Sequence, residues 1–118
     1  MPYLLLIMEE KDRRRNRAPG QARREYEQMA GFVQTLKGRG VHRASESLRP
    51  LAEGVRVAVR AGKRVVADGP FAEAKEMVGG FFLLDCQTRE QAVALASECP
   101  AAEWGTVEVR EVGPCYQD

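Results

Sequence analysis

The chain has 118 residues and a formal net charge of +1, and 44% of its residues are hydrophobic. This length and ordinary composition predict one globular domain over residues 1–118, and they exclude a low-complexity chain. The longest apolar run near the start covers only residues 3–8, which is too short for a signal-peptide core or a membrane span. We therefore expect a cytoplasmic protein that does not enter a membrane.

Positive charge is concentrated in the first half of the chain. Residues 1–60 carry 13 Lys or Arg and 7 Asp or Glu, whereas residues 61–118 carry 5 and 10. The densest basic stretch covers residues 11–17, and such a run is more typical of a solvated loop than of a binding surface. No aromatic residue lies among its arginines to stack on bases, so direct nucleic-acid binding is not expected. Contact with a phosphate or an acidic partner is still compatible with it.

Cysteine and histidine are too few and too scattered to build a metal site. Cys86, Cys99 and Cys115 are widely spaced, and His42 is the single histidine of the sequence. An odd number of cysteines without a CxxC pair predicts reduced thiols, with Cys86 and Cys99 in the core. The sequence also contains no phosphate-cradling or dinucleotide-binding glycine loop, so we expect no metal and no cofactor.

The first half of the chain predicts a strand, a loop, a helix and a second strand. Residues 3–8 are continuously apolar, which is typical of a strand buried on both faces in the middle of a sheet. After a polar loop at 9–19, apolar residues recur at helical spacing until Gly38 and Gly40 end the helix. The apolar stripe of this helix consists of Ala22, Tyr26, Met29, Val33 and Leu36. Residues 41–48 follow as a weaker strand with polar content.

The second half predicts a hairpin and two further strands. Residues 55–60 alternate in polarity, and a turn at 61–64 leads into a paired strand at 65–67. Residues 81–86 form another buried strand, and residues 106–112 close the chain as an alternating strand.

A second helix is expected between the last two strands. Thr88 and Gln91 form the Thr-x-x-Gln capping-box pattern that opens a helix, and Pro100 ends it. Its buried stripe consists of Ala92, Leu95, Ala96 and Cys99.

Without the hairpin, the order of elements is β-α-β followed by β-α-β. This order predicts an α+β fold, a ferredoxin-like split β-α-β protomer with an antiparallel sheet and an inserted β-hairpin. Because the helices cover one face, we expect a homodimer that buries the other face sheet against sheet.

The stretch "VADGPFAEAKEMVGG" at 66–80 separates the hairpin from the next strand. Asp68 can bond the backbone N–H groups just ahead of it, and Pro70 suits the first position of a helix. Good helix formers follow, which predicts a short helix over residues 70–77 that Gly79 ends. These roles alone give the stretch a complete structural explanation.

The predicted short helix also offers a binding surface. Phe71 and Lys75 would share one of its faces, and Glu73 and Glu76 would share another. Two carboxylates on one face could bind a cation or a guanidinium group, and Asp68 with Lys75 could hold a polar small molecule.

The same stretch closely resembles the signature of the DGPF family, which belongs to the YCII-related superfamily. The resemblance extends to "YLLLIM", "GVHRASESLRP", "VRVAVRAGKRVVADGPFAE" and "TVEVREV", and it covers nearly the whole chain apart from the charged loop. It implies a protomer of a dimeric α+β barrel with a cleft near the dimer sheet. Members are often encoded beside, or fused to, sigma factors of the extracytoplasmic-function type, which implies a role in transcription with a sigma factor as partner.

The broader superfamily has been suggested to be enzymatic through a His-Asp pair in its cleft. This sequence departs from that pattern, because His42 follows the first predicted helix instead of lying within it. The positions that match the family signature are Asp68, Gly69, Pro70, Phe71, Glu73, Lys75 and Glu76.

Two functions are compatible with these observations. The favoured one is a small-molecule-binding or regulatory homodimer. Its expected ligand-binding residues are Asp68, Phe71, Glu73, Lys75 and Glu76. The alternative is a small acid/base enzyme that acts on a polar metabolite, with His42 and Asp68 as candidate catalytic residues. Ser45 and Ser47 alternate on one strand face, but no Gly-x-Ser-x-Gly elbow surrounds them. The sequence does not decide whether the chain is an enzyme, and a purely structural dimer is the third possibility.

Overall fold

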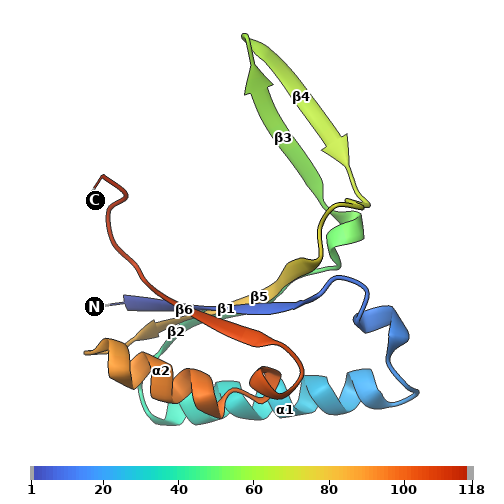
Figure 1. Ribbon diagram of the computed structural model, residues 1–118. Helices are drawn as coiled ribbons and strands as arrows, with labels where there is room; N and C mark the ends of the chain where they lie inside the picture. Colours follow the sequence, from blue (N-terminus) through green and yellow to red (C-terminus); the bar gives the residue numbers. More distant parts are fainter. Residues whose placement is uncertain (1, 117–118) are drawn as a thin grey trace.

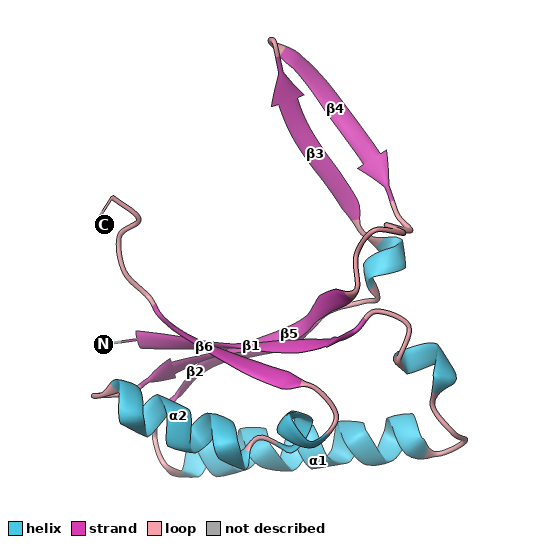
Figure 2. Ribbon diagram, in the orientation of Figure 1, coloured by secondary structure: helices cyan, strands magenta, loops and turns pink. Residues whose placement is uncertain are grey.

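The computed structural model describes residues 2–116, and across these residues two α-helices lie on one face of a four-stranded sheet (Figure 1). The helices are α1 (Gln21–Gly38) and α2 (Arg89–Glu98). The strands are β1 (Pro2–Glu10), β2 (His42–Ser47), β3 (Val55–Arg60), β4 (Lys63–Asp68), β5 (Glu76–Asp85) and β6 (Thr106–Glu111). In this part of the chain the 3₁₀-helices are η1 (Arg14–Asn16), η2 (Leu51–Glu53) and η3 (Pro100–Glu103), which lie in the connections (Figure 2).

The four-stranded sheet has the order β2-β5-β1-β6, and every neighbouring pair is antiparallel. Strands β3 and β4 form a separate hairpin that is inserted between β2 and β5. The remaining order of elements, β1-α1-β2 and β5-α2-β6, is that of two split β-α-β units on one sheet. The predicted α+β, ferredoxin-like fold is therefore confirmed.

Strand β1 lies in the middle of the sheet, between β5 and β6, as predicted. Its burial alternates, however. Tyr3, Leu5 and Ile7 on the helix side are at most 6% exposed, whereas Leu4 and Leu6 on the other side are half-buried. The prediction of a strand buried on both faces is wrong for a single chain, because the helices cover one side only.

One hydrophobic core fills the layer between the helices and the sheet. Phe32 and Leu36 of α1 pack there against the sheet, and the Phe32 ring meets Phe82 edge to face with 5.3 Å between ring centroids. The two central thiols, Cys86 and Cys99, are buried in this core as predicted. The core residues are Tyr3, Leu5, Ile7, Phe32, Leu36, Val41, Phe82, Leu84, Cys86, Ala92, Leu95, Ala96, Cys99 and Ala101.

Helix α2 begins where its capping pattern predicts. The Thr88 hydroxyl accepts a hydrogen bond from the Gln91 backbone N–H at 3.1 Å, and the Gln91 side-chain oxygen accepts one from Gln87 N–H at 2.8 Å. The first bond satisfies a backbone donor that a helix start leaves unpaired, and the second ties the residue before the cap to the first turn. Within residues 2–116, no helix combines the length and apolar character that crossing a membrane requires.

The β3–β4 hairpin rises from the sheet on the side away from the helices (Figure 1). Ala61 and Gly62 make its tight turn with φ values of 52° and 76°, a backbone region in which glycine is unstrained. Strand β4 begins at Lys63, two residues before the predicted start. Val57 and Val59 are 64% and 62% exposed, so the other described residues leave these valines largely uncovered.

The short helix predicted over residues 70–77 is wrong. Residues 69–75 form an irregular turn that contains a cis Gly69–Pro70 bond, and β5 already begins at Glu76, five positions before the predicted strand. Lys11 holds this turn, because its Nζ donates to the carbonyl oxygens of Phe71 and Ala72 at 3.3 and 3.1 Å. Its backbone N–H also donates to the Lys75 carbonyl at 3.1 Å. These contacts with a segment distant in sequence replace the bonds of a helix.

Candidate functional site

A cleft of about 570 Å³ lies between α1 and the sheet, and we call it the helix–sheet cleft. This volume falls within the range typical of small-molecule sites. About half of its lining side chains are apolar, and the remainder are polar or charged. Helix α1 contributes Ala22, Tyr26, Met29 and Val33, the sheet contributes Ile7, Ser45 and Phe82, and the segment around η3 contributes Ala101 and Trp104.

The helix–sheet cleft exists because α1 buries bulky side chains against the sheet through its C-terminal half. Phe32 and Leu36 are 6% and 0% exposed, but Tyr26 is 72% exposed although it belongs to the predicted apolar stripe. Met29 and Val33 are only partly buried. The first half of the apolar stripe therefore lines an open cleft instead of closing the core.

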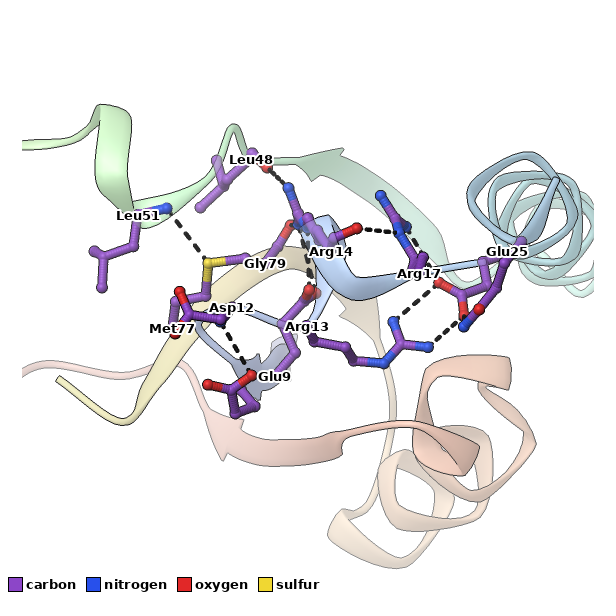
Figure 3. Close-up of polar contacts among 12 residues, drawn as sticks. Glu9, Asp12, Arg13, Arg14, Arg17, Glu25, Leu48, Leu51, Met77 and Gly79 are labelled. Carbon is purple, nitrogen blue, oxygen red and sulfur yellow. Dashed lines mark hydrogen bonds and ion pairs between the residues drawn. The ribbon is translucent and has the colours of Figure 1, made fainter. Parts of the chain in front are cut away.

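Glu25 forms the charged rim of the cleft at the start of α1 (Figure 3). Its carboxylate accepts hydrogen bonds from both terminal nitrogens of Arg13, from Arg17 at 3.2 Å and from Gln21 at 3.1 Å. The hydrogen bonds from Arg13 contribute most to lowering the pKa of Glu25, and those from Gln21 and Arg17 add to it. Together they bring this pKa to about 2, although burial alone would raise it. The Arg13 guanidinium also lies 5.2 Å from the centre of the Trp104 ring.

Arg14 joins three segments on the other side of the rim. It binds both carboxylate oxygens of the buried Glu9, at 3.0 and 3.4 Å, and it donates to the carbonyl oxygens of Leu48 at 2.6 Å and Gly79 at 3.1 Å (Figure 3). A side chain at Gly79 would overlap the Glu9 carboxylate and approach Arg14 Nη2 to 2.9 Å. In its observed position the Glu9–Arg14 pair leaves no room for a side chain at residue 79.

The basic stretch 11–17 is ordered and is not the solvated loop that its composition predicts. The side chains of Arg13, Arg14 and Arg17 are only 18%, 22% and 23% exposed, whereas that of Arg15 is 75% exposed. Two buried carboxylates, Glu9 and Glu25, hold the three covered arginines. Charge pairs of this kind fix the position of an arginine fork more firmly than solvent does.

His42 lies beside the cleft at the start of β2. Its Nε2 is 2.7 Å from the Ser45 hydroxyl oxygen, and Ser45 lines the cleft. The bulge between His42 and Ala44 makes this contact possible, because it places two side chains three positions apart on the same side of the strand. The arrangement can move a proton between the cleft and the imidazole ring.

Residues 68–76 of the "DGPF" stretch lie at the base of the hairpin and do not line the helix–sheet cleft, whereas Gly79 and Gly80 at its end do. Phe71 is buried under the Arg56 guanidinium, 3.8 Å from the ring centre, and Glu73 accepts a 2.9 Å hydrogen bond from the same arginine. Lys75 and Glu76 are exposed, and the expected common faces of Phe71 with Lys75 and of Glu73 with Glu76 are wrong because the helix is absent.

Asp68, at the end of β4, is exposed, and its carboxylate makes no hydrogen bond or ion pair with the described residues. It therefore does not cap the turn as the sequence predicts. Ligand binding at Asp68, Phe71, Glu73, Lys75 and Glu76 stays a prediction.

Two features of the sequence point to the cleft, although sequence reasoning did not connect them. The apolar stripe on α1 and the run of arginines before it are both visible, but nothing local shows that Glu25 pairs with Arg13 and Arg17. Within residues 2–116, no group of three or more His, Cys, Asp or Glu side chains is placed to hold a metal ion.

The fold and the cleft define a ferredoxin-like α+β protein with a cleft of small-molecule size between helix and sheet. The chain belongs to the family of the YCII-related domain, whose model matches residues 1–115. It is also 44% identical over 52 residues to an uncharacterized protein from Rhizobium meliloti (strain 1021). That match spans 42% of this chain and 42% of the relative, so it covers less than half of each.

Proposed function

We propose that this protein binds a small molecule in the helix–sheet cleft. The observation that carries the proposal is the apolar stripe of α1, whose residues Tyr26, Met29 and Val33 line an open cleft beside an ordered charged rim. Apolar walls with a few fixed polar groups are the usual composition of a ligand site. The rim supplies those groups through Arg13 and Arg17, which the buried Glu25 carboxylate holds in place.

A thermal-shift screen against a broad panel of metabolites tests this proposal. A ligand that binds only the folded state stabilises it by about 2.7 kcal/mol at a hundredfold excess over Kd. Val33→Trp fills the cleft from α1 and abolishes the shift, whereas Lys75→Ala at the hairpin base retains it. The reverse pattern would place the ligand at the "DGPF" stretch, and a panel without any shift would reject small-molecule binding.

The proposed functional unit is a homodimer. The sheet face away from the helices carries half-buried Leu4, Leu6, Phe81 and Leu83, and the exposed valines of the β3–β4 hairpin stand above that side (Figure 1). Leu4 pairs with Leu83 and Leu6 with Phe81 across β1 and β5, so these side chains form one continuous apolar surface. A second copy related by a two-fold axis would cover both surfaces at once.

Sedimentation analysis of hairpin variants tests the dimer. Val57→Lys introduces a charge on a valine that is 64% exposed in the single chain, so the protomer keeps its fold and the dimer dissociates. Val93→Lys is the matched control, because Val93 is 39% exposed on α2, on the helix side of the sheet. Equal sedimentation of both variants and the wild type would reject this interface.

A regulatory role in transcription rests on the resemblance to the DGPF family alone. It predicts that a sigma factor of the extracytoplasmic-function type co-purifies with the tagged protein. If a variant with reversed charges at residues 11–17 still captures the sigma factor, that stretch is not the contact. If the wild-type protein captures no sigma factor, the regulatory role is rejected.

A second candidate function is a small acid/base enzyme, and the 2.7 Å contact between His42 Nε2 and the Ser45 hydroxyl favours it. Ser45 would pass a substrate proton to His42, which acts as the base. The test incubates each ligand from the screen with the protein and follows its conversion by mass spectrometry. His42→Gln should then stop conversion without abolishing binding, and unchanged ligand in the wild-type sample would reject the enzyme.

A further inference from the structure

We propose that the ligand is a phosphate ester, whose phosphate group binds in a groove lined by arginines next to the helix–sheet cleft. The inference rests on the proposed function, because it names the ligand class of the same site. The groove has a volume of about 460 Å³ and lies between η1 and the connection from β2 to η2. We call it the arginine groove.

Four arginines face the arginine groove: Arg14, Arg15, Arg17 and Arg49. Ser47 adds a hydroxyl group, and among the described residues no acidic side chain lines the groove. Arginine presents five N–H donors in a planar fork that suits phosphate oxygens, so four such forks around one hollow favour an anion with several oxygens.

The arginine groove adjoins the helix–sheet cleft. Arg14, Arg17 and Ser47 line both hollows, so a ligand that spans these residues would meet both the apolar wall and the arginines. An anionic end in the groove and an apolar body in the cleft would then match the chemistry of each part. A free metabolite of this kind has the size and polarity pattern that typical ligand sites select.

Two of the arginines are positioned before the ligand arrives. Glu9 and two backbone carbonyl oxygens hold Arg14, and Glu25 with the Arg14 carbonyl oxygen holds Arg17. Arg17 uses Nε and Nη1 for these bonds, and among the described residues no acceptor binds its Nη2. A fixed guanidinium group with unused donors binds an anion without a further ordering cost.

The other two arginines can exchange their partners at little cost. Arg15 pairs with Asp12 and Arg49 with Glu53, and both arginines are largely exposed, at 75% and 84% of the side chain. Exposed ion pairs of this kind contribute little to stability, so a doubly charged phosphate can displace them. A carboxylate has only two oxygens and one charge, whereas a phosphate ester offers three oxygens and up to two charges to several arginines.

Isothermal titration with three aromatic probes tests the inference. Phenyl phosphate carries both an apolar body and the phosphate, benzoate replaces the phosphate by a carboxylate, and phenol lacks the anion. Arg49→Ala should weaken phenyl phosphate binding by roughly tenfold and leave phenol binding unchanged. Benzoate should bind the wild type several-fold more weakly than phenyl phosphate.

The matched control is Arg23→Ala. Arg23 forms the same i,i+4 pair with Glu27 on α1, at 3.1 Å and with 86% exposure, but it lies outside the groove. Equal weakening by Arg23→Ala and Arg49→Ala would show a general charge effect and overturn the inference, as would equal affinity for benzoate and phenyl phosphate. A third outcome separates the two hollows. If inorganic phosphate binding depends on Arg49 but Val33→Trp leaves phenyl phosphate binding unchanged, the groove is supported as the binding site and the cleft is rejected.

Discussion

The Arg13 guanidinium binds both carboxylate oxygens of Glu25, with 2.9 Å between Arg13 Nη1 and Glu25 Oε1 and a second bond from Nη2 to Oε2. The two residues are twelve positions apart, one in the loop after β1 and the other in the first turns of α1. This two-pronged pair fixes the basic loop against the mouth of the helix–sheet cleft, so the stability of the rim depends on the ionised form of Glu25.

The stability of the protein should therefore fall in acid because of Glu25. Its pKa is lowered from 4.5 to about 2, chiefly by the Arg13 hydrogen bonds. A lowered pKa in the folded state stabilises the protein above pH 4.5, and this stabilisation is lost as the pH falls from 4.5 to about 2. The shift corresponds to roughly 3 kcal/mol in the free energy of unfolding, which urea unfolding at several pH values measures.

Glu25→Gln should be less stable than the wild type at neutral pH and should lack that part of the acid dependence. The control is Glu27→Gln, because the Glu27 side chain is 63% exposed in its pair with Arg23. An unchanged acid slope in Glu25→Gln would show that other carboxylates cause the loss.

Replacement of Gly79 by alanine should destabilise the rim. The new Cβ would push apart the buried Glu9 carboxylate and Arg14, which breaks hydrogen bonds to charged groups. We expect a loss of about 2 kcal/mol in the free energy of unfolding, measured by urea titration. In Gly31→Ala, whose new Cβ meets nothing within 4 Å on α1, stability should instead rise by about 0.5–1 kcal/mol. Similar values for the two variants would contradict the assigned role of Gly79.

Thr88→Ala should cost about 1 kcal/mol, because the start of α2 loses the acceptor of the Gln91 N–H bond. Thermal unfolding measures the change, and Thr88→Ser should recover most of it since serine is an equally good cap. If serine and alanine lower the melting temperature by the same amount, the methyl group of Thr88 and not its hydroxyl stabilises the helix.

Phe71→Ala should loosen the base of the hairpin. Phe71 is 7% exposed and lies under Arg56, so its removal leaves a cavity between the turn 69–75 and β3. Hydrogen exchange followed by mass spectrometry should show faster exchange in residues 55–75 and unchanged protection in β1 and β5. Asp68→Ala, at an exposed side chain without a polar partner among the described residues, should leave both regions unchanged. Faster exchange in Asp68→Ala would restore the capping role that the sequence predicts.

Local patterns in the sequence determined most of the elements. The alternation at 55–60, the helical stripe after residue 20 and the Thr88 capping box each act over a few neighbouring residues, and each predicted an element that the structure contains. The order of these elements then fixed the ferredoxin-like topology, since few arrangements connect two β-α-β units on one antiparallel sheet.

Contacts between distant segments decided the rest. Residues 70–77 include good helix formers, yet they do not form a helix. Lys11 binds the carbonyl oxygens of Phe71 and Ala72 and holds this segment as a turn. The pairing of Arg14 with Glu9 and Gly79 and that of Arg13 with Glu25 likewise convert a charged stretch into an ordered rim. Propensity contributes a few tenths of a kcal/mol per residue, whereas buried side chains and charged hydrogen bonds contribute several times more. Local patterns in the sequence were therefore enough to determine the fold. The positions of the cleft and of its arginines depend on contacts between distant segments, so only the tertiary structure decided them.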